Sequence, residues 1–377
     1  MTLRRSALIL AAAATILWHT STSLDAQTAL GGGQAASAAT SRIAKPYGPP
    51  RTPDGRPDLQ GTWNVATLTP LERPEALKDR VSLTDEEAAR IAKTEQGVRE
   101  LRSRTSRADR DAPPQGGDGS TGAAGGVGGY NYFWIDRGSS ALKIDGQWRS
   151  SLIVDPLDGR VPPMLPEARE RNATINAPTS DQPENDPNAH FSPWMYEDHE
   201  KHPLAERCIL GFGSTSGPPV LPNYFYNNLK QIVQTRDTIL IFIEMVHDAR
   251  IVRMNQPHLP SHIRKWMGDS IGRWDGDTLV IETTNFTDKT RFRGSSDNLK
   301  VTEYIRRIDN DTLLYRFTID DPSTWSRPWT GEYPWVRTDE LIYEYACHEG
   351  NYSFGGILRG ARLLEKEATE AAEAKKK

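Results

Sequence analysis

A series of short apolar segments in the second half of the chain constrains the fold more than any other feature. The segments span residues 229–235, 238–244, 250–254, 278–286, 299–308, 312–320 and 340–347. Turn residues separate them, as in Arg236-Asp237, Asp275-Gly276-Asp277 and Asp309-Asn310-Asp311. Short strands in series with tight turns favour an antiparallel meander that closes into a barrel or stacks as a sandwich. The sequence therefore predicts a mainly β fold with an N-terminal helix and long loops.

Alternation along these segments predicts which side chains face the core. One face of the expected strands carries Leu279, Ile281, Thr283, Leu313, Tyr315, Phe317 and Ile319. The other face carries Glu282, Arg307, Arg316 and Asp320. We therefore expect the first set inside the barrel or sandwich and the second set outside.

The first half of the chain predicts less regular structure. Residues 51–115 form an N-terminal segment, in which 65–71 is a strand candidate and 84–103 a helix. Thr84 and Glu87 have the spacing of a capping box at the start of that helix. Residues 116–129 are a glycine-rich linker, because neither flank supplies the strand and helix of a dinucleotide fingerprint. A β-rich domain is expected at 130–362, with a long irregular excursion at 163–206 and a charged tail at 363–377.

The first residues predict export. Arg4 and Arg5 precede an apolar run at 7–18, the pattern of a signal peptide over 1–26. The run is shorter than the roughly 20 residues that span a bilayer, so we expect no membrane span after cleavage. Ala26 and Ala38 are alternative cleavage positions, the two arginines also permit a twin-arginine signal, and 27–50 reads as a flexible leader. The expected location is secreted or periplasmic.

The chain contains two cysteines, Cys208 and Cys347. In an oxidising compartment an even pair predicts one disulfide, and the alternative is two buried free thiols or one reactive thiol. The composition is that of an ordinary soluble protein, with 25% charged residues and a net charge of -4. No long stretch is strongly basic, so nucleic acid is not an expected partner.

Several blocks of the sequence resemble a family of secreted, uncharacterised bacterial proteins. They are PDGRPDLQGTW at 53–63, TPLER at 69–73, SLIVD at 151–155, ERC at 206–208, GRWDGDTLV at 272–280 with Asn285-Phe286, DDPSTWSRPW at 320–329 and YEYACHEG at 343–350. The resemblance spans most of the mature chain. It implies export and brings no known activity, cofactor or catalytic residue. Gly61-Thr62-Trp63 is also similar to the opening of lipocalin-like barrels.

The densest polar chemistry lies at Glu244, His247, Asp248 and Arg250. A carboxylate beside a histidine orients the ring and raises its basicity, which serves a general base or a metal ligand. His348 and Glu349, directly after Cys347, would be held at a strand end by the disulfide. Convergence of both histidines with a carboxylate would resemble a two-His, one-carboxylate metal site, although no spacing demonstrates it. The alternative is a surface strand end with ordinary ion pairs.

Aromatic residues form a third candidate site. Trp325, Trp329 and Trp335 alternate with Arg327 and prolines. Flat rings with few polar neighbours suit stacking of a sugar or an aromatic ligand, and Arg327 or Arg250 would orient an acidic group. The alternative is a hydrophobic plug that closes one end of a barrel.

Two functional hypotheses follow from these sites. The first is binding of a small, partly apolar ligand, such as an aromatic metabolite or a glycan, in a barrel mouth or cleft. The second is an extracellular hydrolase or lyase that uses the histidine and carboxylate site, with or without a metal. The sequence specifies neither a cofactor nor an oligomeric state.

Overall fold

The computed structural model describes residues 47–103, 135–176, 198–211, 217–223, 226–349 and 351–375. All of them belong to one compact unit, Tyr47–Lys377. The predicted signal peptide, both cleavage positions, most of the leader and the linker at 116–129 lie outside the described residues.

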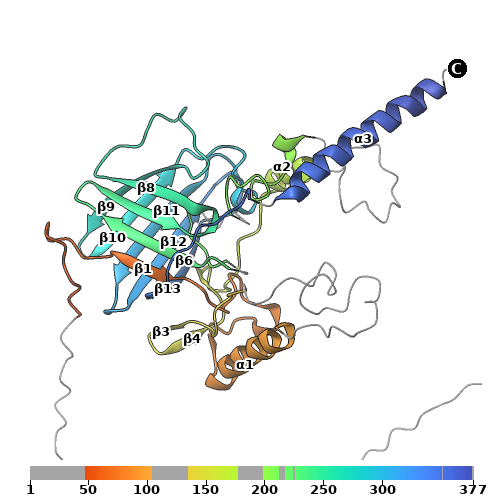
Figure 1. The fold of residues 1–377 in the computed structure, drawn as a ribbon. Coiled ribbons are helices and arrows are strands. Elements are labelled where there is room, and N and C mark those ends of the chain that lie inside the picture. Colours follow the sequence, from red (N-terminus) through yellow and green to blue (C-terminus); the bar gives the residue numbers. More distant parts are fainter. Residues whose placement is uncertain are drawn as a thin grey trace, which may run out of the picture. The chain divides into compact units, whose positions relative to one another are not determined.

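Nine strands of the described residues form a closed, mixed β-barrel (Figure 1). In order around the ring they are β1 (Gly61–Asn64), β6 (Leu229–Gln234), β7 (Thr238–Ile243), β8 (Asp248–Met254), β9 (Asp269–Asp275), β10 (Thr278–Thr284), β11 (Lys300–Arg307), β12 (Thr312–Asp320) and β13 (Trp329–Arg337). Pairing of β1 with β13 closes the ring, with Trp63 opposite Arg337. The prediction of a mainly β barrel is confirmed.

One edge of β13 is shared between two partners. Its end pairs with β1, while its start pairs with β5 (Ile153–Asp155), where Thr330 lies opposite Asp155. Gly331 faces the interior beneath Phe317, and a Cβ there would lie 2.3 Å from the Phe317 Cζ atom. Only glycine fits this close approach.

The order is a meander from β6 to β13 with one departure. β8 and β9 pair in parallel, with Val252 opposite Ser270, whereas the other pairs in the ring are antiparallel. The long connection at 255–268 carries the chain back to the end at which β8 began, and parallel strands require such a crossover. The predicted antiparallel meander is therefore interrupted at this one pair.

Two strand predictions are corrected. Residues 340–347 contain no strand, and the last strand of the ring is instead β13. Its inward positions are Trp329, Gly331, Tyr333 and Trp335, so the aromatic residues alternate as a strand does. Pro334 obscured that pattern. The first strand lies at 61–64 rather than at 65–71.

The predicted inward residues of β10 and β12 are all buried. Leu279, Ile281, Thr283, Leu313, Tyr315, Phe317 and Ile319 are each 0% exposed. Arg307 contradicts its predicted outward position, since it is buried and shares the inner face of β11 with Val301, Glu303 and Ile305. Its guanidinium lies over the Trp63 ring and donates to the Asp58 carbonyl at 2.7 Å. A charged side chain can face inward here because its donors are satisfied.

A segment of the chain itself enters the barrel interior. Residues 217–223 are all buried. The Val220 N–H donates to the Tyr315 hydroxyl at 2.8 Å, and the Tyr333 hydroxyl donates to the Val220 carbonyl at 2.8 Å. The interior at this level is therefore filled by protein.

A small sheet and a helix lie outside the ring. The sheet has the order β2 (Ser82–Leu83), β4 (Gln147–Arg149) and β3 (Lys143–Ile144), and η1 (Glu75–Leu77) precedes it. The helix α1 (Asp85–Arg102) begins with the predicted capping box. The Thr84 side chain accepts from the Glu87 N–H, and the Thr84 N–H donates to the Glu87 carboxylate. The predicted helix is confirmed.

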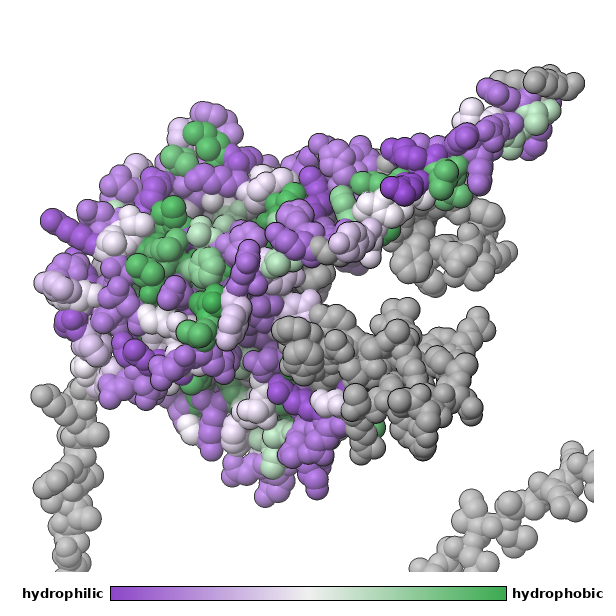
Figure 2. Space-filling model, in the orientation of Figure 1, coloured by the Kyte–Doolittle hydropathy of each residue, from purple (hydrophilic) through white to green (hydrophobic). Residues whose placement is uncertain are grey.

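The remaining helices of the described residues are α2 (Pro166–Asn176), α3 (Tyr352–Ala374) and the short turns η5 (His199–Lys201), η7 (Met245–His247) and η8 (Phe292–Gly294). α3 has no buried residue, and apolar side chains appear among polar ones along it in Figure 2. Its exposed apolar residues include Tyr352, Ile357, Leu363 and Leu364. No helix within the described ranges has the length and apolar character that a membrane span needs.

Candidate functional site: a cleft at one end of the barrel

A cleft of about 1030 Å³ lies where β6 begins and β7 ends. Its lining comes mainly from residues 226–229, 339–341 and 343–347, joined by Glu244 and Asn351. The barrel end therefore forms one wall, and the segment between β13 and α3 forms another. The volume is at the upper end of the range that small-molecule sites occupy.

A tight turn at the end of β7 positions Glu244. The turn is η7 (Met245–His247), in which Val246 has a φ of 63° and His247 a φ of 47°. A β-branched residue in the left-handed region is strained, and surrounding packing must hold it there. Met245 and Val246 are both buried in the hydrophobic core, and this core packing holds the turn in place. Asn227, which also lines the cleft, is left-handed too, at a φ of 58°.

Glu244 is buried at the floor of the cleft, at 6% exposed. Its carboxylate accepts from the Leu229 N–H at 3.2 Å, and its own N–H donates to the Leu229 carbonyl. Burial raises the pKa of Glu244, and hydrogen bonds from the Leu229 and Tyr343 backbone oppose that rise only in part. The group is thus a partly desolvated carboxyl in a cleft, which is a common property of functional sites.

Lys230 lies beneath this floor and was missed by the sequence analysis. It shares the inner face of β6 with Ile232 and is 0% exposed. Burial lowers the pKa of Lys230 to about 7, against the attraction of Glu244. Its Nζ donates to the Asn227 carbonyl at 3.3 Å. The period-2 spacing of Lys230 and Ile232 was the available signal, but lysine is seldom placed inside a core.

Two ties hold the outer wall of the cleft against the barrel end. The predicted disulfide is confirmed, since Cys208 and Cys347 are bonded with their Cα atoms 5.9 Å apart. The Nδ1 atom of His247 lies 3.1 Å from the Tyr345 carbonyl oxygen. The disulfide joins Cys347 of the lining to a segment outside the ring, so the wall is part of the folded domain.

The predicted catalytic residues are only partly brought together. Glu244 lines the cleft, and His247 and Asp248 follow it in the turn and at the start of β8. His348 and Glu349 are exposed, and neither lines the cleft. Among the described residues, no group of three His, Cys, Asp or Glu side chains is arranged to hold a metal ion. A catalytic role for these residues stays a prediction.

Arg250 lies in the barrel interior rather than in the cleft. It forms a doubly hydrogen-bonded ion pair with Glu303, in which the distance from Nη2 to Oε1 is 3.0 Å. The Tyr315 hydroxyl donates to the same carboxylate at 2.7 Å. Both charged side chains are almost wholly buried, so this pair is part of the core.

The predicted aromatic site is also core. Trp325, Trp329 and Trp335 are 2%, 0% and 0% exposed. Trp329 packs edge-on against Trp325 and Phe317, and Trp335 stacks on Tyr315 at 4.8 Å between ring centroids. The rings thus cover one another, and a ligand-binding role for them stays a prediction. Arg327 is exposed and pairs with Asp155 at 2.8 Å.

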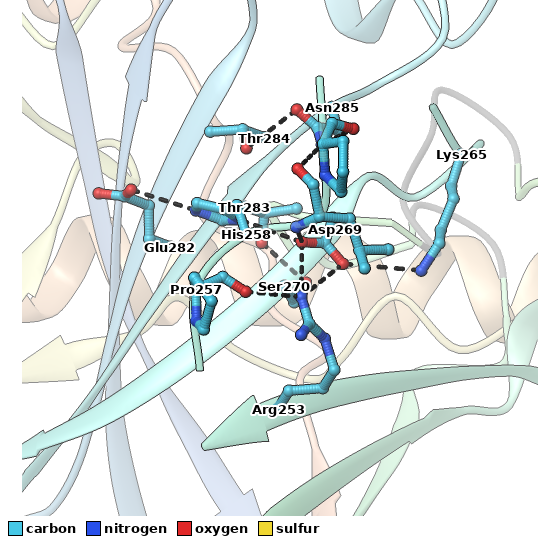
Figure 3. Close-up of polar contacts among 12 residues, drawn as sticks. Arg253, Pro257, His258, Lys265, Asp269, Ser270, Glu282, Thr283, Thr284 and Asn285 are labelled. Atoms are coloured by element: carbon cyan, nitrogen blue, oxygen red, sulfur yellow. Dashed lines mark hydrogen bonds and ion pairs between the residues drawn. The ribbon is translucent and has the colours of Figure 1, made fainter. Parts of the chain in front are cut away.

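A second polar cluster lies on the outer face of the barrel (Figure 3). His258 is placed between two carboxylates, with Nδ1 3.1 Å from Asp269 and Nε2 3.2 Å from Glu282. Arg253 also binds Asp269, at 2.8 Å. Burial raises the pKa of Asp269, but the Leu259 N–H, His258 and Arg253 outweigh it and lower that pKa. These contacts fasten the 255–268 connection to β9 and β10.

The chain matches no described protein family and no curated protein. It is similar to a solved structure of a variant of the fluorescent protein UnaG, at 16% identity and a TM-score of 0.21, over 36% of this chain and 86% of that chain. A similarity this slight carries no argument about function. Membership of the secreted bacterial family therefore stays a prediction.

Proposed function

We propose that this protein binds a small, partly apolar ligand in the cleft at the end of its barrel. The observation that carries the proposal is the cleft itself, whose lining combines aromatic and aliphatic side chains with a few hydrogen-bonding groups. Tyr226, Leu229 and Tyr343 offer apolar contact area, and Asn227 and Asn351 offer polar contacts that would orient a ligand. The barrel interior is less suitable as a ligand site, because residues 217–223 and the buried tryptophans fill it.

A blocking substitution tests the proposal. Ala346 is exposed and lines the cleft, so Ala346→Trp places a large ring in the ligand's space. Ala372 is exposed on α3 and takes no part in the cleft, so Ala372→Trp is the matched control. A fragment library is screened by ligand-detected NMR against the full chain and both variants. We expect hits that Ala346→Trp abolishes and Ala372→Trp retains. A library without such hits would overturn the proposal.

We further propose that the protein acts after export, in a secreted or periplasmic location. The Cys208–Cys347 disulfide supports this, because such bonds persist in oxidising compartments. Mass spectrometry of the protein recovered from outside the cytoplasm tests it. The expected mass is that of a chain cleaved after Ala26 or Ala38 with both cysteines oxidised. An uncleaved chain confined to the cytoplasm, with free thiols, contradicts it.

A further inference from the structure

The charged residues that line the cleft in the described part of the chain are all acidic. Among the described lining residues none is Lys, Arg or His. The carboxylates are Asp136, Glu206, Glu244, Asp339, Glu340 and Glu344. A concave surface lined by one sign of charge concentrates ligands of the opposite sign.

Two of these carboxylates already have side-chain partners. Asp136 pairs with Arg99 at 3.1 Å, and Glu206 lies 2.8 Å from the His202 ring. Asp339, Glu340 and Glu344, the three carboxylates of the 339–344 wall, form no ion pair within the described ranges. Glu244 adds less to the charge of the cleft, because Lys230 opposes it and burial raises the pKa of Glu244 itself. The cleft therefore retains a net negative field.

Three tyrosines accompany these carboxylates. Tyr226, Tyr343 and Tyr345 line the cleft, and Tyr343 is 70% exposed. The face of an aromatic ring attracts a cation through its quadrupole, and aromatic side chains are the usual partners of quaternary ammonium groups. Tyrosine rings next to carboxylates thus match a ligand that is both positively charged and apolar at its surface.

We infer that the ligand of the cleft is an organic ammonium ion, whose alkyl groups contact the tyrosine rings while the carboxylates of the 339–344 wall balance its charge. This inference rests on the proposed function and names its ligand class. A metal ion suits the site less well, because divalent cations require several oxygen ligands at short distance. The described residues contain no such group.

Three shape-matched probes test the charge requirement. Choline is titrated into the full, oxidised chain by calorimetry, alongside its neutral isostere, in which C(CH₃)₃ replaces N(CH₃)₃⁺, and the carboxylate analogue of that isostere. We expect choline to bind at least roughly tenfold more tightly than the neutral compound and less tightly as salt is added, and the anion not to bind. Equal affinity for the neutral compound, or no binding of choline, overturns the ammonium inference. Hits in the fragment screen that Ala346→Trp abolishes would still leave the proposed function standing.

Paired variants locate the interaction. Tyr343→Leu removes the ring at a cleft position, whereas Tyr352→Leu removes one that is 89% exposed and outside the lining. We expect choline affinity to fall roughly threefold to thirtyfold in Tyr343→Leu and to stay unchanged in Tyr352→Leu. Glu344→Gln and Glu367→Gln change the net charge equally, but only Glu344 lines the cleft. If the two glutamate variants had equal effects on choline affinity, net charge alone would explain the attraction, and the site assignment would be overturned.

Discussion

The barrel interior and the cleft at its end use similar residues for opposite purposes. In the interior, Arg250, Glu303 and Tyr315 bind one another, and almost no surface of them is left for a ligand. In the cleft, Glu344 and Tyr343 are exposed, and their side chains face space that a ligand can occupy. The difference shows that the number of polar contacts alone does not identify a binding site. Contacts that are already satisfied stabilise the fold, while exposed groups that line a concave surface are available to bind.

The largest expected effect on stability comes from breaking the ion pair in the barrel interior. Glu303→Leu removes the partner of a buried guanidinium, so we expect a loss of about 3–5 kcal/mol in the free energy of unfolding. The double variant Arg250→Met with Glu303→Leu removes both charges and should recover most of that loss. Urea unfolding of the two variants and the wild type measures this. If single and double variants are equally unstable, the cost lies in packing rather than in the unpaired charge.

Removal of the disulfide tests the link between the two regions. The bond closes a separation of 139 residues, so Cys208→Ala with Cys347→Ala should cost about 2–5 kcal/mol. It should also weaken ligand binding, because Cys347 belongs to the cleft wall. Thermal unfolding and the ligand titration are measured on the same preparation. Unchanged binding in the variant would show that the His247 contact and packing hold the wall without the bond.

The buried Lys230 next to the cleft should make the free energy of unfolding depend on pH. Its pKa in the folded state, about 7, is below its ordinary value of 10.5, so the unfolded state binds more protons between these values. The burial cost is therefore fully present below pH 7 and is relieved as the pH rises toward 10.5. We expect the wild type to gain about 2 kcal/mol between pH 7 and pH 9 relative to Lys230→Met. Urea unfolding at both pH values checks this, and parallel pH profiles would show that Lys230 is charged in the fold.

The smallest expected effect on stability comes from a substitution in the cleft. Glu344→Gln changes an exposed residue without an ion pair among the described residues, so stability should change by no more than about 0.5 kcal/mol. If the change exceeds that of Glu303→Leu, the distinction between a stabilising interior and an available cleft fails. The same urea series supplies the comparison.

Much of the barrel was predictable from its strands and turns. The alternation of Leu279, Ile281 and Thr283 placed them correctly, because side-chain direction in a strand follows from the backbone alone. The capping box at Thr84 was also predictable, because it joins groups that lie only three residues apart in the sequence. Of the cleft, only Glu244 and Cys347 were identified from the sequence, whereas its tyrosines and the adjacent Lys230 were not.

The sequence by itself determined the period of the strands, the tight turns, the helix start and the availability of one disulfide. Each of these depends on neighbouring residues or on the chemistry of a residue type. Only the tertiary structure decided that β1 pairs with β13, that Lys230, Arg250 and Glu303 face inward, and that residues 339–347 leave the sheet to form the wall of a cleft. Those outcomes depend on partners far apart in the chain. A local pattern can show that a side chain alternates with apolar neighbours, but not which distant groups will meet its charge.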